Sequence, residues 1–288
     1  MVLRQRSRRC RPSGIIAEVS AIYDDPELYQ LACAYRDIPA EVDALLSWAA
    51  RHWAGPSGDS WAAEDGGARS VLELAAGPAD HARELARRGL HSTALDINPT
   101  MCAWARGQAG RHGLALDVVE ADMRDFKVAG SFDLAITMLN SACHLFTLDD
   151  MLAHLGSVAA HMLPGGLYIM ELAHPADVLA EASRTSNEWT TEADGVSVEV
   201  RWGGPVDPID PVTQITREHV NITVRDANGT TRTVTDVVPN RFWSATELTA
   251  AIRLAGGFRI VASYGDFDDT TKLEDPDAWR MILVLRRE

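Results

Sequence analysis

From residue 70 to residue 175, short apolar segments alternate with segments whose apolar residues recur at helical spacing. The short segments are SVLELA, STALDI, ALDVVEAD, FDLAITML and GGLYIMEL. Apolar strands separated by helices are typical of a mostly parallel sheet that helices cover on both faces. The sequence therefore predicts an α/β fold. Gly89 is expected to close the first of these helices, and the helix LDDMLAHLGSVAAHML is expected to end at Pro164.

The segments on either side of this region have different patterns. Residues 15–53 carry helical spacing, with Pro26 and Pro39 near the expected helix starts. After residue 175, β-branched and alternating segments with a DANGTT turn predict an antiparallel insert of about three strands. A helix, a strand and a last strand then complete the α/β pattern. The expected units are a disordered basic tail at 1–14, a helical cap and linker at 15–67, an α/β domain at 68–175 and 243–288, and a β insert at 176–242.

Composition limits the partners. The chain has 288 residues, 46% of them hydrophobic, which is enough for a sizeable core. Its net charge of −14 disfavours nucleic acid as a partner, and no apolar stretch is long enough to predict a membrane span. The basic start has no apolar segment after it and does not resemble a secretory signal. The irregularly spaced cysteines predict free thiols in the cytoplasm and no metal site: Cys10, Cys33, Cys102 and Cys143.

An acid and three small residues accompany the end of the first predicted strand. Glu73 lies in this strand, and the turn after it offers Ala75, Gly77 and Ala79 where nucleotide-binding proteins commonly place glycine. Small residues let a ligand approach the backbone beside the positive N-terminus of the following helix. Asp96 ends the second predicted strand and suits hydrogen bonds to a ribose diol. NAD and S-adenosylmethionine (SAM) both fit these features, and a tight turn without a ligand is the alternative.

The loop discriminates between the two ligands. A pyrophosphate needs close backbone approach, usually through the second glycine of GxGxxG, and Gly77-Pro78-Ala79 does not satisfy that pattern. Pro78 also removes one N–H that could have bound phosphate. Glu73 is unusual beside a phosphate and suits the cationic end of a ligand that carries an amino acid. The sequence therefore favours SAM over NAD.

Several motifs together resemble those of the class I SAM-dependent methyltransferases. ELAAGPA resembles their first motif, E/DxGxGxG, with alanine at two of the three glycine positions. EADMRDF resembles the third motif, FDLAITMLNSACHLF the fourth, and LPGGLYIMEL the segment that enters the fifth strand. The match covers about residues 68–172 and resumes from about 243. ADMRDF, NSACHL and LPGG further resemble glycine/sarcosine-type and macrolide aminosugar N-methyltransferases, which also carry N-terminal helices and an antiparallel insert.

This resemblance implies a Rossmann-like, seven-stranded, mostly parallel sheet with helices on both faces, an antiparallel insert after the fifth strand, and N-terminal helices. It implies that Asp96 binds the ribose, Asp122 the adenine amino group and Arg36 the SAM carboxylate, while Met123 covers the adenine ring. The remaining expected cofactor-binding residues are Tyr29, Tyr35, Glu73, Ala75, Gly77, Ala79, Ile97, Met101, Arg124, Met138 and Asn140.

Catalytic and acceptor residues are expected beyond the fourth strand and in the insert. His144 follows this strand and can accept a proton near neutral pH, with Tyr23 as a second catalytic candidate. Packing in a turn is the alternative for His144, as a polar turn is for Asn140 and Ser141. Glu171 and His174 end the fifth strand, where a solvated loop is the alternative. The candidate acceptor-binding residues are Ser141, Glu171, His174, Trp202, Arg241 and Trp243, and core packing explains the bulky ones equally well.

The leading hypothesis is a SAM-dependent methyltransferase that acts on a small molecule, with N-methylation of an amine or amino sugar first and O-methylation of a hydroxyl second. In-line transfer requires that the nucleophile be aligned and water excluded. A cytoplasmic enzyme of secondary metabolism and a possible homodimer complete the expectation. The alternatives are a SAM-binding protein without catalysis, which the two missing glycines permit, and an NAD-dependent oxidoreductase, which the loop disfavours.

Overall fold

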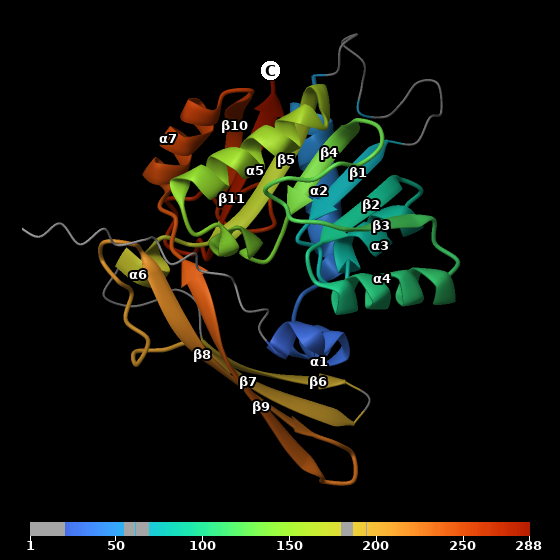
Figure 1. Cartoon of the computed structure of the whole chain (residues 1–288), viewed down its shortest axis with the longest axis vertical. Helices are drawn as coiled ribbons and strands as arrows, with labels where there is room; N and C mark the ends of the chain where they lie inside the picture. The colour runs from blue at the N-terminus through green and yellow to red at the C-terminus, as the bar shows by residue number, and fades with distance from the viewer. Residues whose placement is uncertain (1–20, 55–60, 62–68, 180–186, 194) are drawn as a thin grey trace, which may run out of the picture.

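A computed structural model describes residues 21–54, 61, 69–179, 187–193 and 195–288. The predicted tail at 1–14, the helical start at 15–20 and most of the linker lie outside the described residues. The described strands form two sheets (Figure 1). The main sheet has seven strands in the order β10-β11-β5-β4-β1-β2-β3, and the insert has four in the order β6-β7-β8-β9.

The main sheet is parallel except at β11, as the alternating pattern predicts. β11 pairs antiparallel with both β5 and β10. The seven strands are β1 (Ser70–Leu74), β2 (His91–Asp96), β3 (Leu116–Glu120), β4 (Phe132–Thr137), β5 (Met162–Ala173), β10 (Phe258–Tyr264) and β11 (Arg280–Arg287). The Rossmann-like fold is therefore confirmed.

Helices cover both faces of the main sheet. They are α2 (Ile38–His52), α3 (Asp80–Arg87) and α4 (Pro99–Arg111) on one side, and α5 (Leu148–Ala160) and α7 (Ala245–Ala255) on the other. Local signals set their ends. Pro39 lies in the first turn of α2, Thr147 caps α5 in a reciprocal capping box with Asp150, and Ser244 caps α7. None of the described helices is both long and apolar enough to cross a lipid bilayer.

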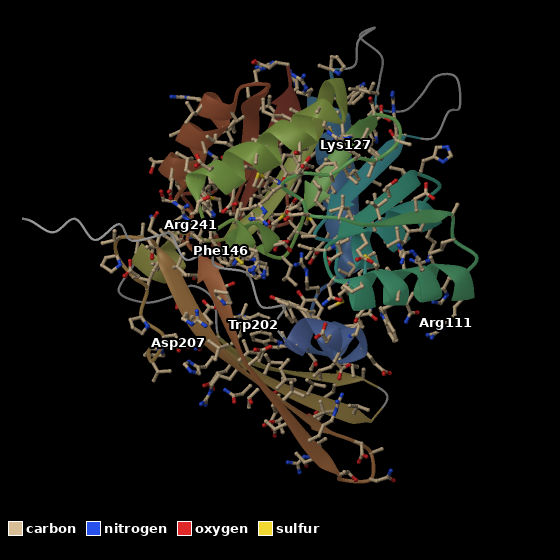
Figure 2. All side chains as sticks on the ribbon, viewed as in Figure 1. Arg111, Lys127, Phe146, Trp202, Asp207 and Arg241 are labelled. Carbon is tan, nitrogen blue, oxygen red and sulfur yellow. The ribbon has the colours of Figure 1, made fainter. Side chains whose placement is uncertain are left out.

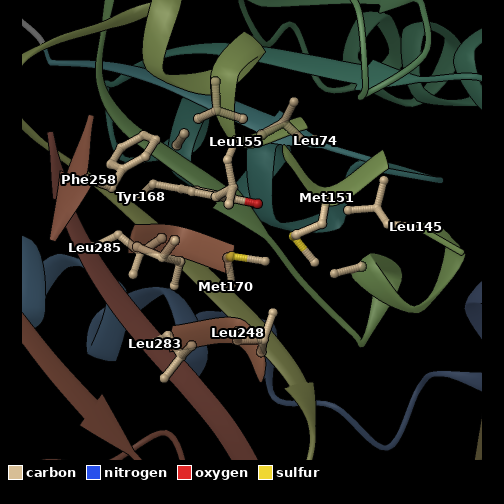
Figure 3. Close-up of a cluster of buried hydrophobic side chains, with 14 of the residues drawn as sticks. Leu74, Leu145, Met151, Leu155, Tyr168, Met170, Leu248, Phe258, Leu283 and Leu285 are labelled. Atoms are coloured by element: carbon tan, nitrogen blue, oxygen red, sulfur yellow. The ribbon is translucent and has the colours of Figure 1, made fainter. Parts of the chain in front are cut away.

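Two layers of apolar side chains fill the space between helices and sheet. Figure 3 shows the layer under α5 and α7, where Met151 and Leu155 of α5 and Leu248 of α7 face Tyr168 and Met170 of β5. All five side chains are fully buried, so each contributes about 1.5–3 kcal/mol of transfer free energy. This core holds the carboxyl ends of β1, β2, β4 and β5 at one edge of the sheet.

The structure corrects the expected end of α5. The helix ends at Ala160, and the segment from Met162, Pro164 included, already belongs to β5. A Cβ on Gly166 would lie 2.9 Å from the carbonyl oxygens of Asp133 and Leu163, so only glycine permits β5 to approach β4 there. The Pro-Gly-Gly sequence therefore serves a strand that enters beside its neighbour with a shift of register.

The insert has four strands and not about three. β6 (Glu188–Ala193), β7 (Val196–Trp202), β8 (Ile215–Arg225) and β9 (Thr231–Arg241) form an antiparallel meander, with the predicted turn joining β8 and β9. β6 escapes detection because it buries one residue, Thr191, and has no run of apolar side chains. A short helix, α6 (Ala176–Leu179), follows β5.

The N-terminal elements lie between the two sheets. The 3-10 helix η1 (Ala21–Asp24) and α1 (Pro26–Ala32) lie on the insert, and α1 separates its strands from α3 and α4 (Figure 1). Ile22, Leu28 and Ala32 are buried against Val220 and Ile222 of β8. The insert and the N-terminal helices thus form one cover beside the carboxyl ends of the main strands.

Candidate active site

The turn between β1 and α3 has a left-handed backbone at three positions. φ is +49° at Ala75, +53° at Gly77 and +59° at Ala79, although alanine pays about 1–2 kcal/mol for this conformation. Ala79 stands at the N-cap of α3 and is fully buried. Non-glycine residues held in this region commonly mark functional sites.

Glu73 and Asp96 hold this turn from two sides. Glu73 Oε2 accepts a hydrogen bond of 2.7 Å from the backbone N–H of Ala82 in the first turn of α3. Asp96 accepts from the N–H groups of Gly77 at 2.7 Å and Asn98 at 2.8 Å. A carboxylate offers about four acceptor positions, so Asp96 keeps capacity for a further donor such as a diol hydroxyl. Burial raises the pKa of Asp96, and these backbone donors counteract it.

A cavity of about 230 Å³ adjoins the turn. It lies between α1, the turn after β1 and the loop after β4, and seven predicted site residues line it: Tyr29, Arg36, Glu73, Ala75, Gly77, Met138 and Ser141. Complete pockets for drug-sized ligands measure about 300–1,000 Å³. The cavity therefore suits one part of a larger ligand, and Asp96 is not among the residues that line it.

A buried chain of alternating charges connects the cavity wall to the sheet. Arg36 Nη2 lies 2.5 Å from Glu41 and 2.8 Å from Glu171, and Arg280 Nε lies 3.0 Å from the other oxygen of Glu171. His81 bridges Glu41 at 2.8 Å and Glu73 at 3.4 Å. The chain runs in the order Arg280, Glu171, Arg36, Glu41, His81 and Glu73. Burial disfavours charge on His81, but its two carboxylate partners prevail and raise its pKa to about 9.

Arg36 has one guanidinium nitrogen that takes no part in these ion pairs. Its Nη1 is buried and has no hydrogen-bond acceptor among the described residues, while the guanidinium lines the cavity. A buried donor without a partner costs about 1–3 kcal/mol. The orphaned nitrogen fits a ligand that brings a carboxylate into the cavity.

The expected adenine residues, Asp122 and Met123, are not among the residues that line the cavity. Both oxygens of Asp122 accept from Arg124, which also reaches Asp150 at 2.9 Å. Burial raises the pKa of Asp122, but Arg124 outweighs it and the net shift is downward. Met101 is buried near Gly77, whereas Ile97 is 58% exposed. Met123 packs against the main core.

The loop after β4 is strained and held to β5. Leu139 and Asn140 have φ of +51° and +59°. The N–H of Leu139 donates to Glu171 at 2.7 Å, and Asn140 Oδ1 accepts from the N–H of Ala173 at 3.1 Å. Ser141 Oγ donates to the carbonyl of Met138. These bonds fix the segment that leads to the predicted catalytic histidine.

His144 and Tyr23 form a pair. The Tyr23 hydroxyl lies 3.2 Å from His144 Nε2, and the Tyr23 ring packs on Tyr29, which lines the cavity. Burial lowers the pKa of His144 to about 4, although a hydrogen bond with the backbone of Pro239 raises it in part. His144 is therefore neutral at pH 7 and a weaker base than its residue type suggests.

Three predicted acceptor-binding residues, Trp243, Arg241 and His174, make contacts with the protein itself. Trp243 is buried in the main core, and the geometry favours packing over acceptor contact. Arg241 stacks on Trp243 at 3.7 Å and bonds the carbonyl of Phe146, near the junction of insert and main domain in Figure 2. His174 bonds the carbonyl of Leu273, away from the cavity wall.

Two further predicted site residues, Tyr35 and Trp202, do not line the cavity. Tyr35 is 44% exposed and meets Trp189 edge to face. Trp202 lies near Glu218 of β8 and lowers the pKa of that carboxylate. Tyr35 therefore lies outside the cavity lining, and Trp202 is associated with a carboxylate that sequence reasoning missed.

Sequence reasoning missed several residues of the site. Some come from the N-terminal segment around α1 and the start of α2, and the others from the turn after β1, the start of α3 and the loop after β4. They are Gln30, Cys33, Ala34, Ile38, Ala76, Pro78, Asp80, His81 and Leu139. The unmatched acid Glu41 and the helix-start histidine His81 were the available signals, because buried charged residues need partners.

The chain is similar in sequence and fold to known methyltransferases. Residues 71–166 match the methyltransferase domain family. The dTDP-3-amino-3,4,6-trideoxy-alpha-D-glucopyranose N,N-dimethyltransferase of Streptomyces venezuelae is 26% identical over 66% of this chain and 75% of its own length. The glycine/sarcosine N-methyltransferase of Aphanothece halophytica is 25% identical over 82% of this chain and 83% of its own. The crystal structure of Streptomyces venezuelae DesVI aligns with a TM-score of 0.70 at 21% identity, over 91% and 98% of the two chains.

The seven-stranded sheet, the acidic turn after β1 and these likenesses define one class of enzyme. The chain belongs to the class I SAM-dependent methyltransferases, and SAM is its cofactor. The orphaned Arg36 nitrogen and the remaining acceptor capacity of Asp96 fit the carboxylate and the ribose of that cofactor.

Proposed function

We propose that the protein methylates the amino group of a small acceptor, an amino sugar first among them. The observation that carries the proposal is the Tyr23–His144 pair, 3.2 Å apart, which lies between the cavity wall and the insert. The names of the similar proteins support it, because sugar N,N-dimethyltransferases and glycine/sarcosine N-methyltransferases both methylate amines.

The chain's residues would divide the work as follows. Arg36 holds the SAM carboxylate, and Asp96 holds the ribose. SAM, when bound, supplies an electrophilic methyl group on its sulfonium. Tyr23 and His144 orient the acceptor nitrogen by hydrogen bonds and keep water away from it. The pair contains no strong base, since the pKa of His144 is lowered to about 4 by burial and that of Tyr23 is raised by burial.

The absence of a strong base in the Tyr23–His144 pair favours N-methylation over the O-methylation alternative. A neutral amine attacks with its own lone pair, whereas a sugar hydroxyl must lose a proton as it attacks. We infer that the predicted base role of His144 is an orienting role.

The test is direct. Purified protein, SAM and one of three amines (dTDP-3-amino-3,4,6-trideoxyglucose, glycine or sarcosine) are incubated, and methylated product and S-adenosylhomocysteine are quantified by mass spectrometry. The control acceptor is the same sugar nucleotide with a hydroxyl in place of the amino group. We expect methyl transfer to an amine and none to the control. Transfer to the hydroxyl alone, or to none of the three amines, would contradict the proposal.

A further inference from the structure

Glu218 is a carboxylate on the inner face of the insert. Side chains alternate along β8, and Val220, Ile222 and Val224 on the same face are buried in the cluster formed with η1 and α1. Glu218 continues this apolar row toward the main domain. A carboxylate at such a position requires hydrogen-bond partners.

Three contacts fix its position. The Asn240 side-chain amide donates to Glu218 Oε2, and the Trp202 side chain lies close enough to the carboxylate to lower its pKa. Gly203 lies against it, with φ of +69°, and a Cβ there would come within 3.1 Å of Glu218 Cγ. Figure 2 shows Trp202 where the insert approaches the main domain. The carboxylate is therefore held in one place by β7, β9 and the turn after β7.

The same contacts lead to the predicted catalytic pair. Asn240 Oδ1 accepts from Cys143 Sγ at 3.0 Å, and Cys143 precedes His144, which meets Tyr23. Burial is the main cause that raises the pKa of Tyr23, and the electrostatic effects of nearby groups, Glu218 and Asp96 among them, add to it. Through Asn240 and Cys143, Glu218 is therefore linked to the segment that carries His144, on the insert side of the Tyr23–His144 pair.

We propose that Glu218 binds the ammonium form of the acceptor's amino group and accepts its proton before methyl transfer. This inference rests on the proposed function. An N–H bond of the ammonium breaks, its electron pair stays on nitrogen, and an O–H bond forms on Glu218. The neutral amine then has the lone pair that the methyl transfer requires, and the protonated Glu218 returns its proton to water.

The electrostatics of the site support this role. The pKa of Glu218 is raised to about 7, chiefly by burial and to a smaller degree by Asp207, against the opposing effects of Asn240 and Trp202. The other charged or titratable groups near it are Arg217 and His219, its exposed neighbours on β8, with Tyr23 and Cys143 of the main domain and cover. A base near pKa 7 is matched to proton transfer at neutral pH, whereas His144 is not.

The kinetic test compares E218Q with wild type, using whichever of the three amines wild type methylates. The glutamine keeps the shape and the Asn240 contact but cannot accept the proton. We expect kcat/KM at pH 7 to fall about 100-fold. We expect the deficit to shrink toward pH 9.5, where the amine loses its proton to water. E199Q is the matched control, because Glu199 lies on β7 with its side chain exposed on the opposite face. We expect no change for E199Q.

A binding test separates this role from a structural one. Affinities of the S-adenosylhomocysteine-bound protein for the amine that wild type methylates and for its hydroxyl counterpart are measured by calorimetry at pH 8. Wild type should prefer the amine about tenfold or more, E218Q should lose the preference, and affinity for S-adenosylhomocysteine should stay within twofold.

Each failure has its own signature. An E218Q variant with the wild-type pH dependence and amine preference would overturn the assignment of Glu218 while wild-type turnover upholds the proposed function. Wild-type protein that binds the amine no better than the hydroxyl counterpart would also overturn the assignment. Absence of turnover by wild type with all three amines would overturn the proposed function itself.

Discussion

Ala75 and Ala79 occupy left-handed conformations that glycine adopts without strain. They differ in what surrounds their methyl groups. Ala75 lines the cavity, whereas Ala79 is fully buried in a small cluster with Ala82 and Ala105. The same substitution by glycine therefore has different consequences at the two positions.

We predict that A75G stabilises the protein by about 1 kcal/mol, because it relieves the backbone strain and loses little packing. A79G should leave stability nearly unchanged, since the loss of a buried methyl, worth about 0.8 kcal/mol, offsets the same relief. Urea unfolding of both variants and wild type measures this. Calorimetry should show SAM affinity within twofold for A79G. A clear gain would mean that the methyl of Ala79 crowds the cofactor, contrary to its burial away from the cavity.

At the scale of elements, the buried chain of charges joins the N-terminal cover to the sheet. Arg36 precedes α2, Glu41 lies on α2, His81 on α3, Glu73 on β1, Glu171 on β5 and Arg280 on β11. A protonated His81 donates through both ring nitrogens to two carboxylates. His81 therefore binds its proton more tightly in the folded state than in the unfolded state. The contacts between α2, α3 and β1 consequently depend on pH.

We predict that alkaline pH destabilises the protein through His81. A histidine whose pKa is raised on folding contributes stability that is complete below about pH 6.5 and is lost as pH rises through about 9. The loss should amount to roughly 1–3 kcal/mol. Urea unfolding from pH 6.5 to 10 should show a steeper decline for wild type than for H81Q. Parallel curves for the two proteins would refute the idea that His81 is charged in the fold.

Sequence patterns predicted the main elements because buried parallel strands are apolar throughout and their helices carry caps and prolines. They failed where the chain departs from those rules. β6, EWTTEA, has one buried side chain and reads as a polar loop, and the Pro-Gly-Gly of β5 reads as a turn although Gly166 serves a close strand approach. Sequence spacing also gives no sign that Arg36 and Glu171 meet, since only folding brings the segment before α2 to β5.

At the scale of the whole molecule, the acceptor side of the site exists only where three distant segments meet. Tyr23 comes from the N-terminal cover, His144 from the main domain, and Glu218 from the insert. A single acid in an alternating strand normally faces water, so periodicity alone did not mark Glu218. The predicted cofactor-binding residues, in contrast, lie mostly within residues 71–144, with a few more around α1. Their motifs could be identified in the sequence because each motif is a short continuous segment.

We predict that SAM stabilises the folded protein and that NAD does not. SAM at about 100 times its dissociation constant should add about 2.7 kcal/mol to the free energy of unfolding. For a chain of this size the melting temperature should rise by about 5–10 °C. NAD should produce no shift, because Pro78 offers no N–H to a pyrophosphate and the turn lacks the second glycine of a dinucleotide loop.

The variant D96N provides the internal control for this experiment. Asparagine keeps an acceptor for the N–H of Gly77, 2.7 Å from the carboxylate in wild type, but lacks the charge that strengthens bonds to a ribose diol. A tenfold loss of affinity would reduce the stabilisation at the same SAM concentration to about 1.4 kcal/mol. An equal shift for D96N and wild type would remove Asp96 from the cofactor site. A shift with NAD as large as that with SAM would show that the turn tolerates a pyrophosphate after all.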